Sequence, residues 1–223
     1  MTAEPLVNLD RSTLRERALE ALRSAITSGQ YRPGDHLGEV ELATNLGISR
    51  GTVREALRHL QQEGLVTASN RNMLRVSTIS PRDVRELFRV RAALEGLALS
   101  EIIASPQRKK AVLALREALS RLADTDDAGD FTTRLEADLG FHLLLCELSG
   151  NAVLVEAWRY LEGRIRVTIM NCESVDTPSM MARTRHAPIV DAIERGDVEA
   201  ARSVIEHHMA AAAQQYAPSD DDA

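Results

Sequence analysis

The segment from Glu39 to Leu60 constrains the fold more than any other part of the chain, because it encodes two short helices separated by a tight turn. Leu42 and Leu46 share one face of the first helix. Gly47 can adopt the left-handed conformation that ends a helix, and Ser49 can cap the next helix. This order of helix, glycine, cap and helix predicts a helix-turn-helix.

The exposed start of the second helix is expected to contact DNA. In a helix-turn-helix this end enters the major groove, where arginine can form two hydrogen bonds with guanine. Hydroxyl groups and the free N–H groups of the first turn suit phosphates. The residues expected to contact DNA here are Ser49, Arg50, Gly51, Thr52 and Arg54. Taken alone, the two arginines would indicate a solvated helix face, and only the surrounding motif favours DNA contact.

Two short β-prone runs follow, at 65–67 and 74–76, and predict a small hairpin. Together with a helix expected at 12–28, they complete a winged helix-turn-helix. Arg71 lies at the expected tip of the wing. It either contacts DNA there or faces water as a turn residue.

The charge distribution favours a local nucleic-acid surface on an acidic chain. The formal net charge is −6, which at first argues against such a partner. Over residues 49–76, however, five arginines stand against two glutamates, a local excess that suits DNA. Aromatic residues make up only 3% of the chain, which disfavours stacking on single strands. The expected nucleic-acid partner is therefore double-stranded DNA.

The rest of the chain predicts only helices. A serine cap, a proline and an aspartate in Ser80-Pro-Arg-Asp83 mark the start of the first of them. The expected helices cover about 81–104, 105–123, 131–149, 151–173, 177–196 and 197–216, with an acidic loop at 124–130. We predict a mainly α protein, with an N-terminal winged helix-turn-helix and a C-terminal all-α six-helix bundle. The predicted boundaries are a DNA-binding domain at 1–76, a linker at 77–82, the helical domain at 83–217 and an acidic tail at 218–223.

One carboxylate and three histidines fall on inward-facing apolar stripes of three of these helices. Asp138 and His142 are four residues apart, so their side chains project together. His186 and His208 lie on the fifth and sixth helices of the bundle. An unpaired buried carboxylate is costly, whereas three imidazoles and a carboxylate suit a divalent zinc or nickel ion. Each histidine alone would more often be a hydrogen-bonded core residue, and only the combination predicts a metal site.

Residues 12–76 resemble the winged-helix domain of the GntR family of bacterial transcription regulators. The resemblance rests on pieces such as Arg32-Pro-Gly-Asp35, Leu46-Gly-Ile-Ser-Arg50 and Val53-Arg-Glu-Ala-Leu57. It implies the same DNA-contacting set at the start of the second helix. Gly51 and Thr52 replace the more usual Thr-Pro of the family, and Asn72 stands where the wing normally carries glycine.

Residues 82–212 resemble the FadR-type C-terminal domain of that family, called FCD, and six helices resemble its shorter VanR-like branch. The matching pieces include Asp138-Leu-Gly-Phe-His142 and the segment from His186 to Asp197. The resemblance implies a divalent metal held by Asp138, His142, His186 and His208. It also implies a small organic acid as effector, with Arg91 as the arginine that would hold its carboxylate. The residues themselves slightly favour the other interpretation of that arginine, a helical pair between Arg91 and Glu95.

The leading hypothesis is a ligand-responsive transcription regulator, a repressor that binds a palindromic operator as a homodimer. The alternative is a metal-dependent hydrolase in which the Asp/His₃ site activates water. No HExxH, GxSxG, phosphate-binding loop or dinucleotide motif accompanies that site. A third possibility is a purely structural metal bundle that senses no ligand.

The sequence also favours a cytoplasmic protein. The N-terminus lacks the apolar run of a secretory signal, and no segment has the roughly 18 uncharged apolar residues of a membrane helix. The two cysteines, Cys146 and Cys172, show no paired spacing. A reducing compartment and the absence of a membrane partner are therefore expected.

Overall fold

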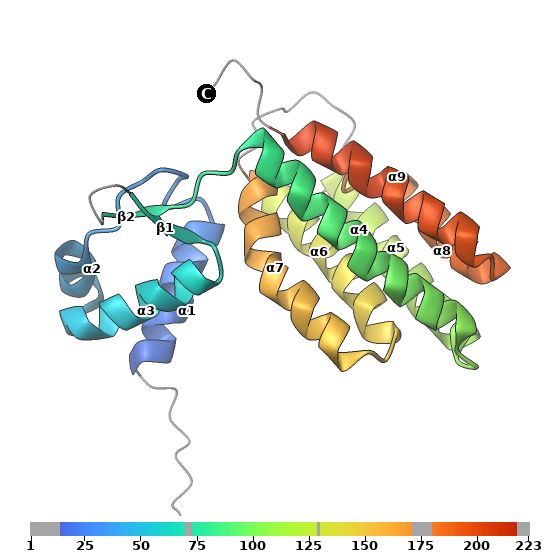
Figure 1. The fold of residues 1–223 in the computed structure, drawn as a ribbon, viewed down its shortest axis with the longest axis horizontal. Coiled ribbons are helices and arrows are strands. Elements are labelled where there is room, and N and C mark those ends of the chain that lie inside the picture. Colours follow the sequence, from blue (N-terminus) through green and yellow to red (C-terminus); the bar gives the residue numbers. More distant parts are fainter. Residues whose placement is uncertain (1–13, 70–72, 129, 171–179, 218–223) are drawn as a thin grey trace, which may run out of the picture. The chain divides into compact units, whose positions relative to one another are not determined.

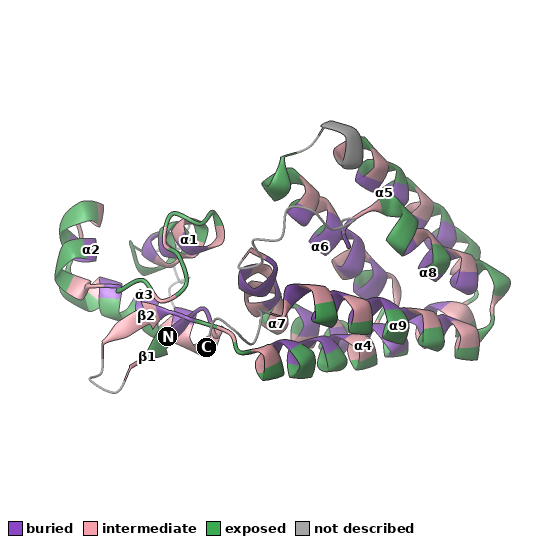
Figure 2. Cartoon of the chain, turned by 90° about the horizontal axis from the view of Figure 1, so that it is seen from above, coloured by how far each residue is buried: buried purple, intermediate pink, exposed green. Residues whose placement is uncertain are grey.

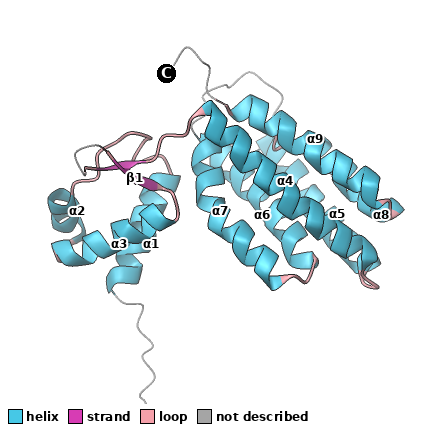
Figure 3. Cartoon of the chain, viewed as in Figure 1, coloured by secondary structure: helices cyan, strands magenta, loops and turns pink. Residues whose placement is uncertain are grey.

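The computed structural model describes residues 14–69, 73–128, 130–170 and 180–217 of the 223-residue chain. Over these residues it contains nine helices and one two-stranded sheet (Figure 1 and Figure 3). The chain divides into two compact units, Met1–Ser77 and Thr78–Ala223. The predicted mainly α architecture, a winged helix-turn-helix followed by a helical bundle, is confirmed.

Over residues 14–69 and 73–77, the first unit contains three helices and a pair of antiparallel strands. The elements are α1 (Leu14–Thr27), α2 (Glu39–Leu46), α3 (Arg50–Gln62), β1 (Val66–Ala68) and β2 (Leu74–Val76). Helix α1 packs across α3, and the apolar stripes of both are buried. The buried residues of these two helices are Ala18, Leu22, Ile26, Val53, Ala56, Leu57 and Leu60.

The turn between α2 and α3 forms as the sequence predicts. Gly47 ends α2 with φ 64°, a left-handed conformation that glycine adopts without strain. The Ser49 hydroxyl then accepts a hydrogen bond from the Thr52 backbone N–H at 3.1 Å and caps α3. These two local signals set the entry of the chain into α3 and so the direction of its exposed first turn.

The wing is a short antiparallel pair in which Val66 lies opposite Val76. A third extended segment, not expected from the sequence, joins it through a bridge between His36 and Arg75. The Leu37 N–H donates to the Leu74 carbonyl at 2.8 Å, which holds this segment against β2. The predicted wing tip, with Arg71, lies outside the described residues.

The second unit is a bundle of six helices within the described residues. They are α4 (Pro81–Ala104), α5 (Arg108–Ala128), α6 (Phe131–Leu148), α7 (Ala152–Met170), α8 (Arg183–Arg195) and α9 (Val198–Tyr216). Figure 2 shows the buried residues along the inward faces of these helices. Helices α4 and α9 pack along each other over much of their length. Trp158, Phe88 and Phe141 are among the largest fully buried side chains.

Two predicted boundaries in this unit are wrong. Helix α5 continues to Ala128, so most of the acidic segment 124–130 is helical rather than a loop. Helix α8 begins at Arg183, later than the predicted start at 177, and residues 171–179 lie outside the described part. Met180 and Met181 are both buried just before α8, where adjacent side chains enter the core from a turn. The predicted linker 77–82 contains the first residues of α4, and the predicted tail at 218–223 lies outside the described residues.

Candidate metal centre and nucleic-acid interface

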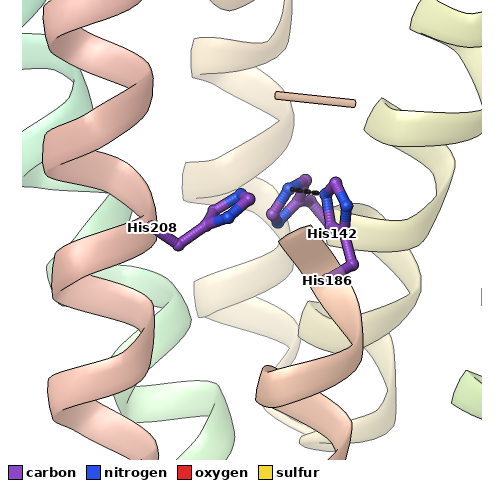
Figure 4. A group of neighbouring side chains, drawn as sticks. All are labelled: His142, His186 and His208. Atoms are coloured by element: carbon purple, nitrogen blue, oxygen red, sulfur yellow. Dashed lines mark hydrogen bonds between the residues drawn. The ribbon is translucent and has the colours of Figure 1, made fainter. Parts of the chain in front are cut away.

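Three helices of the bundle bring the four predicted metal ligands to one place. Asp138 and His142 come from α6, His186 from α8 and His208 from α9. Figure 4 shows the three imidazole rings converging from these helices. One ring nitrogen of each histidine lies within 4.8 Å of the other two. All three histidines and the aspartate are buried.

The carboxylate of Asp138 completes the cluster on one side. Its Oδ1 atom lies 3.0 Å from Nε2 of His186 and 4.0 Å from Nε2 of His142. The two Nε2 atoms are 3.1 Å apart. The ring centre of His208 lies 5.3 Å from that of His142 and 4.7 Å from that of His186. These separations are typical of ligands that share one metal ion at about 2.0–2.2 Å each.

The outer nitrogens of two rings are already engaged. Nδ1 of His186 lies 3.0 Å from the Ala182 carbonyl, to which it can only donate. Nδ1 of His142 lies 2.7 Å from the carboxylate of Glu95. In neutral rings these bonds place the protons on Nδ1 and leave lone pairs on both Nε2 atoms. The lone pairs and the Asp138 carboxylate then face one another with no hydrogen between them, an arrangement that a divalent cation stabilises.

Burial favours the neutral form of two of these histidines, His142 and His208. It lowers the pKa of His142 below the usual histidine value, although Glu95 opposes the shift. Burial also lowers the pKa of His208 well below that value, with help from the neighbouring His186 and His142. Burial opposes the ionisation of Asp138, yet its contacts with His186 and His142 lower its pKa overall. These three groups are therefore in the protonation states that metal binding requires.

Glu95 is part of the site, although the sequence analysis predicted it only as a partner of Arg91. Its side chain is fully buried on α4, and it accepts hydrogen bonds from Arg91 Nε at 3.1 Å and Trp158 Nε1 at 3.0 Å. Burial would raise its pKa, but His142 and Arg91 outweigh that effect and lower it to about 2. A carboxylate that holds the outer nitrogen of a ligand histidine is a common feature of metal sites. The only signal for it in the sequence is the spacing of Arg91 and Glu95.

Arg91 forms the predicted pair with Glu95 and still has an open donor. Its side chain is only 2% exposed, and its guanidinium lies over the Phe88 ring at 5.1 Å. The Nη2 atom is buried and has no hydrogen-bond partner among the described residues. A buried donor without an acceptor is costly. The role of Arg91 in effector binding stays a prediction, and Nη2 is the donor that this role would use.

A cavity of about 360 Å³ lies between α8 and α9 and is lined in part by His208. Thr184, Arg185, Ser203 and His207 supply polar groups to its wall. His208 is also the most exposed of the four predicted ligands, at 9%. The His208 face is therefore the side of the metal site that adjoins solvent-accessible space.

The predicted DNA-contacting residues of α3 lie together on its first turns. Ser49, Arg50 and Gly51 are exposed, and Thr52 is half-buried. Arg54 is exposed but engaged: its Nε and Nη2 atoms donate to the two carboxylate oxygens of Glu39 at 2.8 and 2.7 Å. This ion pair joins α2 to α3 across the turn, and the sequence prediction missed it. Arg71, the sixth predicted residue, lies outside the described part of the chain.

Comparison with known proteins gives matches over both units. Residues 14–76 match the family described as "Bacterial regulatory proteins, gntR family", and residues 86–211 match the FCD domain. A probable D-xylose utilization operon transcriptional repressor of Paenarthrobacter nicotinovorans is 32% identical over 91% of this chain and 88% of its own length. The transcriptional repressor RspR of Escherichia coli K12 is 26% identical over 94% of this chain and 91% of its own.

Solved structures match as well. A putative transcriptional regulator GntR from Rhodococcus sp. RHA1 superposes with a TM-score of 0.77 at 26% identity, covering 92% of this chain and 98% of its own. The families and relatives are transcription regulators, not enzymes. Among the described helices, none combines the length and apolar character needed to cross a bilayer.

Proposed function

Because the chain belongs to the gntR family of bacterial regulatory proteins and carries an FCD domain, we propose that it is a metal-dependent, ligand-responsive repressor. In this proposal it binds a palindromic operator as a homodimer in the cytoplasm and responds to a small organic acid. The observation that carries the proposal is the convergence of three buried ligand atoms: Nε2 of His186 lies 3.0 Å from Oδ1 of Asp138 and 3.1 Å from Nε2 of His142.

A divalent zinc or nickel ion would be held by Asp138, His142, His186 and His208. When bound, the ion would supply a Lewis acid and a positive charge that attract a carboxylate. The chain contributes two buried negative side chains, Asp138 and Glu95, and one buried positive side chain, Arg91. A divalent ion therefore leaves one excess positive charge in the core. A monoanionic carboxylate balances that charge, and the open Nη2 of Arg91 supports the same class of ligand.

The effector hypothesis is tested by operator release. In a titration of the metal-loaded chain with small mono- and dicarboxylic acids, one class is expected to weaken operator binding by about 5- to 150-fold. Arg91→Lys keeps the buried charge but loses the planar guanidinium, so the response is expected to shrink while metal is still bound. Fluorescence anisotropy of a labelled operator measures the loss of operator binding in the wild type and in the variant. A metal-loaded chain that no acid releases would favour the purely structural metal site.

A groove on the outer side of α4 and α9 supports the proposed homodimer. Its volume is about 820 Å³, and alanines, Phe88 and Met209 supply its apolar lining. Arg85 and Arg89 lie on its α4 side and Glu206 on its α9 side. In a two-fold arrangement the arginines of one copy can face the glutamate of the other, as an isologous contact requires.

Ala93→Arg, which places a large charge in this groove, is expected to turn the dimer into a monomer. Ala93 is exposed within one chain, so the substitution should leave the fold of the monomer intact. Val153→Arg is the matched control, because Val153 is 76% exposed on α7, away from the groove. Sedimentation velocity measures the assembly state. Equal masses for the two variants, both dimeric or both monomeric, would contradict this location of the interface.

A further inference from the structure

One arginine of α3, Arg54, is held in a defined orientation by Glu39 of the preceding helix α2. Nε and Nη2 of Arg54 donate to Oε1 and Oε2 of Glu39, so the pair is bidentate. The side chain of Arg54 is 54% exposed, whereas that of Glu39 is 25% exposed. The bond from Arg54 lowers the pKa of Glu39, so this carboxylate is ionised at neutral pH. By contrast, the pair of Arg58 and Glu55 within α3 is a single, longer contact of 3.4 Å.

The geometry of the pair leaves the tip of Arg54 free to bind. A guanidinium has five N–H donors, and Glu39 uses one on Nε and one on Nη2. Both donors of Nη1 and the second donor of Nη2 remain. Nη1 and Nη2 together form the end-on edge, which can pair with O6 and N7 of guanine. The side-on edge, occupied by Glu39, is thereby withheld from phosphate oxygens.

We propose that Glu39 is a specificity-determining positioning residue, which fixes the Arg54 guanidinium so that its end-on edge reads a base. This inference rests on the proposed operator recognition by α3. A restrained arginine loses less freedom when it binds the correct base. The carboxylate also repels the phosphate backbone, so it weakens binding to sequences that offer Arg54 no base partner. Both effects raise the ratio of operator affinity to non-specific affinity.

Glu41 offers a matched control for the charge. It is an exposed acid in the same first turn of α2, and no ion pair of Glu41 is found among the described residues. Glu39→Ala and Glu41→Ala remove the same charge from the same short helix. Only Glu39→Ala releases Arg54. A difference between them therefore reports on positioning rather than on net charge.

The experiment measures the affinities of the full chain for its selected operator, for each single-base change in it and for a scrambled duplex, at constant salt. Glu39→Ala is expected to lower the ratio of operator to scrambled affinity by about tenfold. The loss should fall at the base pair that Arg54→Ala also relaxes, and the double variant should show little further loss. Glu39→Gln, which keeps one carbonyl acceptor, is expected to lie between wild type and Glu39→Ala. Circular dichroism and thermal unfolding check that each variant is folded.

Two results would overturn the inference, and they are distinguishable. If Glu39→Ala raises operator and scrambled affinity by the same factor as Glu41→Ala, Glu39 acts only through its charge, and base reading by Arg54 can still hold. If Arg54→Ala lowers the preference for the operator base at no position, Arg54 does not read a base, and the proposed role of Glu39 fails as well.

Discussion

Zinc or nickel is expected to raise the melting temperature of the metal-free chain by about 5–15 °C, and His186→Ala is expected to abolish that shift. A ligand at 100 to 1,000 times its dissociation constant stabilises the folded state by about 2.7–4.1 kcal/mol, and each kcal/mol moves the melting temperature of a chain of this size by about 2–4 °C. His186 contacts Asp138 and His142 through the same Nε2 atom, so its removal takes away the central donor.

The matched control is His207→Ala. His207 is next to the predicted ligand His208 in the chain, but it is exposed, and its Nδ1 lies 2.6 Å from the Ser203 carbonyl. This variant is expected to keep the full shift. Thermal unfolding and metal content by atomic emission measure the two properties independently. An unchanged shift in His186→Ala, or a metal-free wild type that takes up no divalent ion, would contradict the assignment of the site.

Glu95→Ala is expected to lower the free energy of unfolding of the bundle by about 3–5 kcal/mol, the range for breaking a buried ion pair from one side. Removal of the Glu95 side chain leaves the buried charge of Arg91 without its carboxylate partner. It also removes the acceptor of Trp158 Nε1 and the partner of His142 Nδ1. Urea unfolding followed by circular dichroism measures the change.

A control for this variant lies on the same helix. Glu86 pairs with Arg82 at the same spacing of four residues, but both side chains are well exposed. Glu86→Ala is therefore expected to change the stability little, because water screens such pairs. The double variant Arg91→Met/Glu95→Met removes both buried charges and should recover part of the lost stability. Equal losses in Glu86→Ala and Glu95→Ala would show that burial of the pair does not matter.

Signals that act over a few residues were sufficient to predict most of the fold. Gly47 and Ser49 end α2 and begin α3 as expected, and Asp197 caps α9 by accepting from the Ala200 N–H. The start of α8 was mispredicted because its first flanking residue, Ala182, has no capping side chain. The predicted start at 177 rested on Pro178 after Thr177, because proline is favoured in the first turn of a helix.

The sequence predicted those parts of the metal site that follow from the spacing of residues within one helix. Asp138 and His142 share a face of α6 by their spacing, and the apolar neighbours of His186 and His208 indicated that these residues point inward. The role of Glu95 could not be predicted, because its contact with His142 joins residues 47 positions apart. Such contacts depend on how helices pack, and no periodicity within one helix encodes them.

At the predicted DNA-contacting surface, too, the contact between two helices could not be predicted from the sequence. The exposure of Arg50 and Arg54 follows from the buried stripe on the opposite face of α3. The bond from Arg54 to Glu39 crosses the turn between two helices, 15 residues apart. It depends on the crossing of α2 and α3, which the sequence indicates only as a motif.

Selection of random duplexes by the purified full chain tests the central claim most directly. It is done at near-physiological salt with metal-free, zinc-loaded and nickel-loaded protein, so that a requirement for metal is itself observed. We expect a short palindrome with two equivalent half-sites, and loss of preference at defined positions in Arg50→Ala and Arg54→Ala, each by about 1–3 kcal/mol. Weak binding that depends steeply on salt and yields no motif in any metal state would contradict operator recognition by α3.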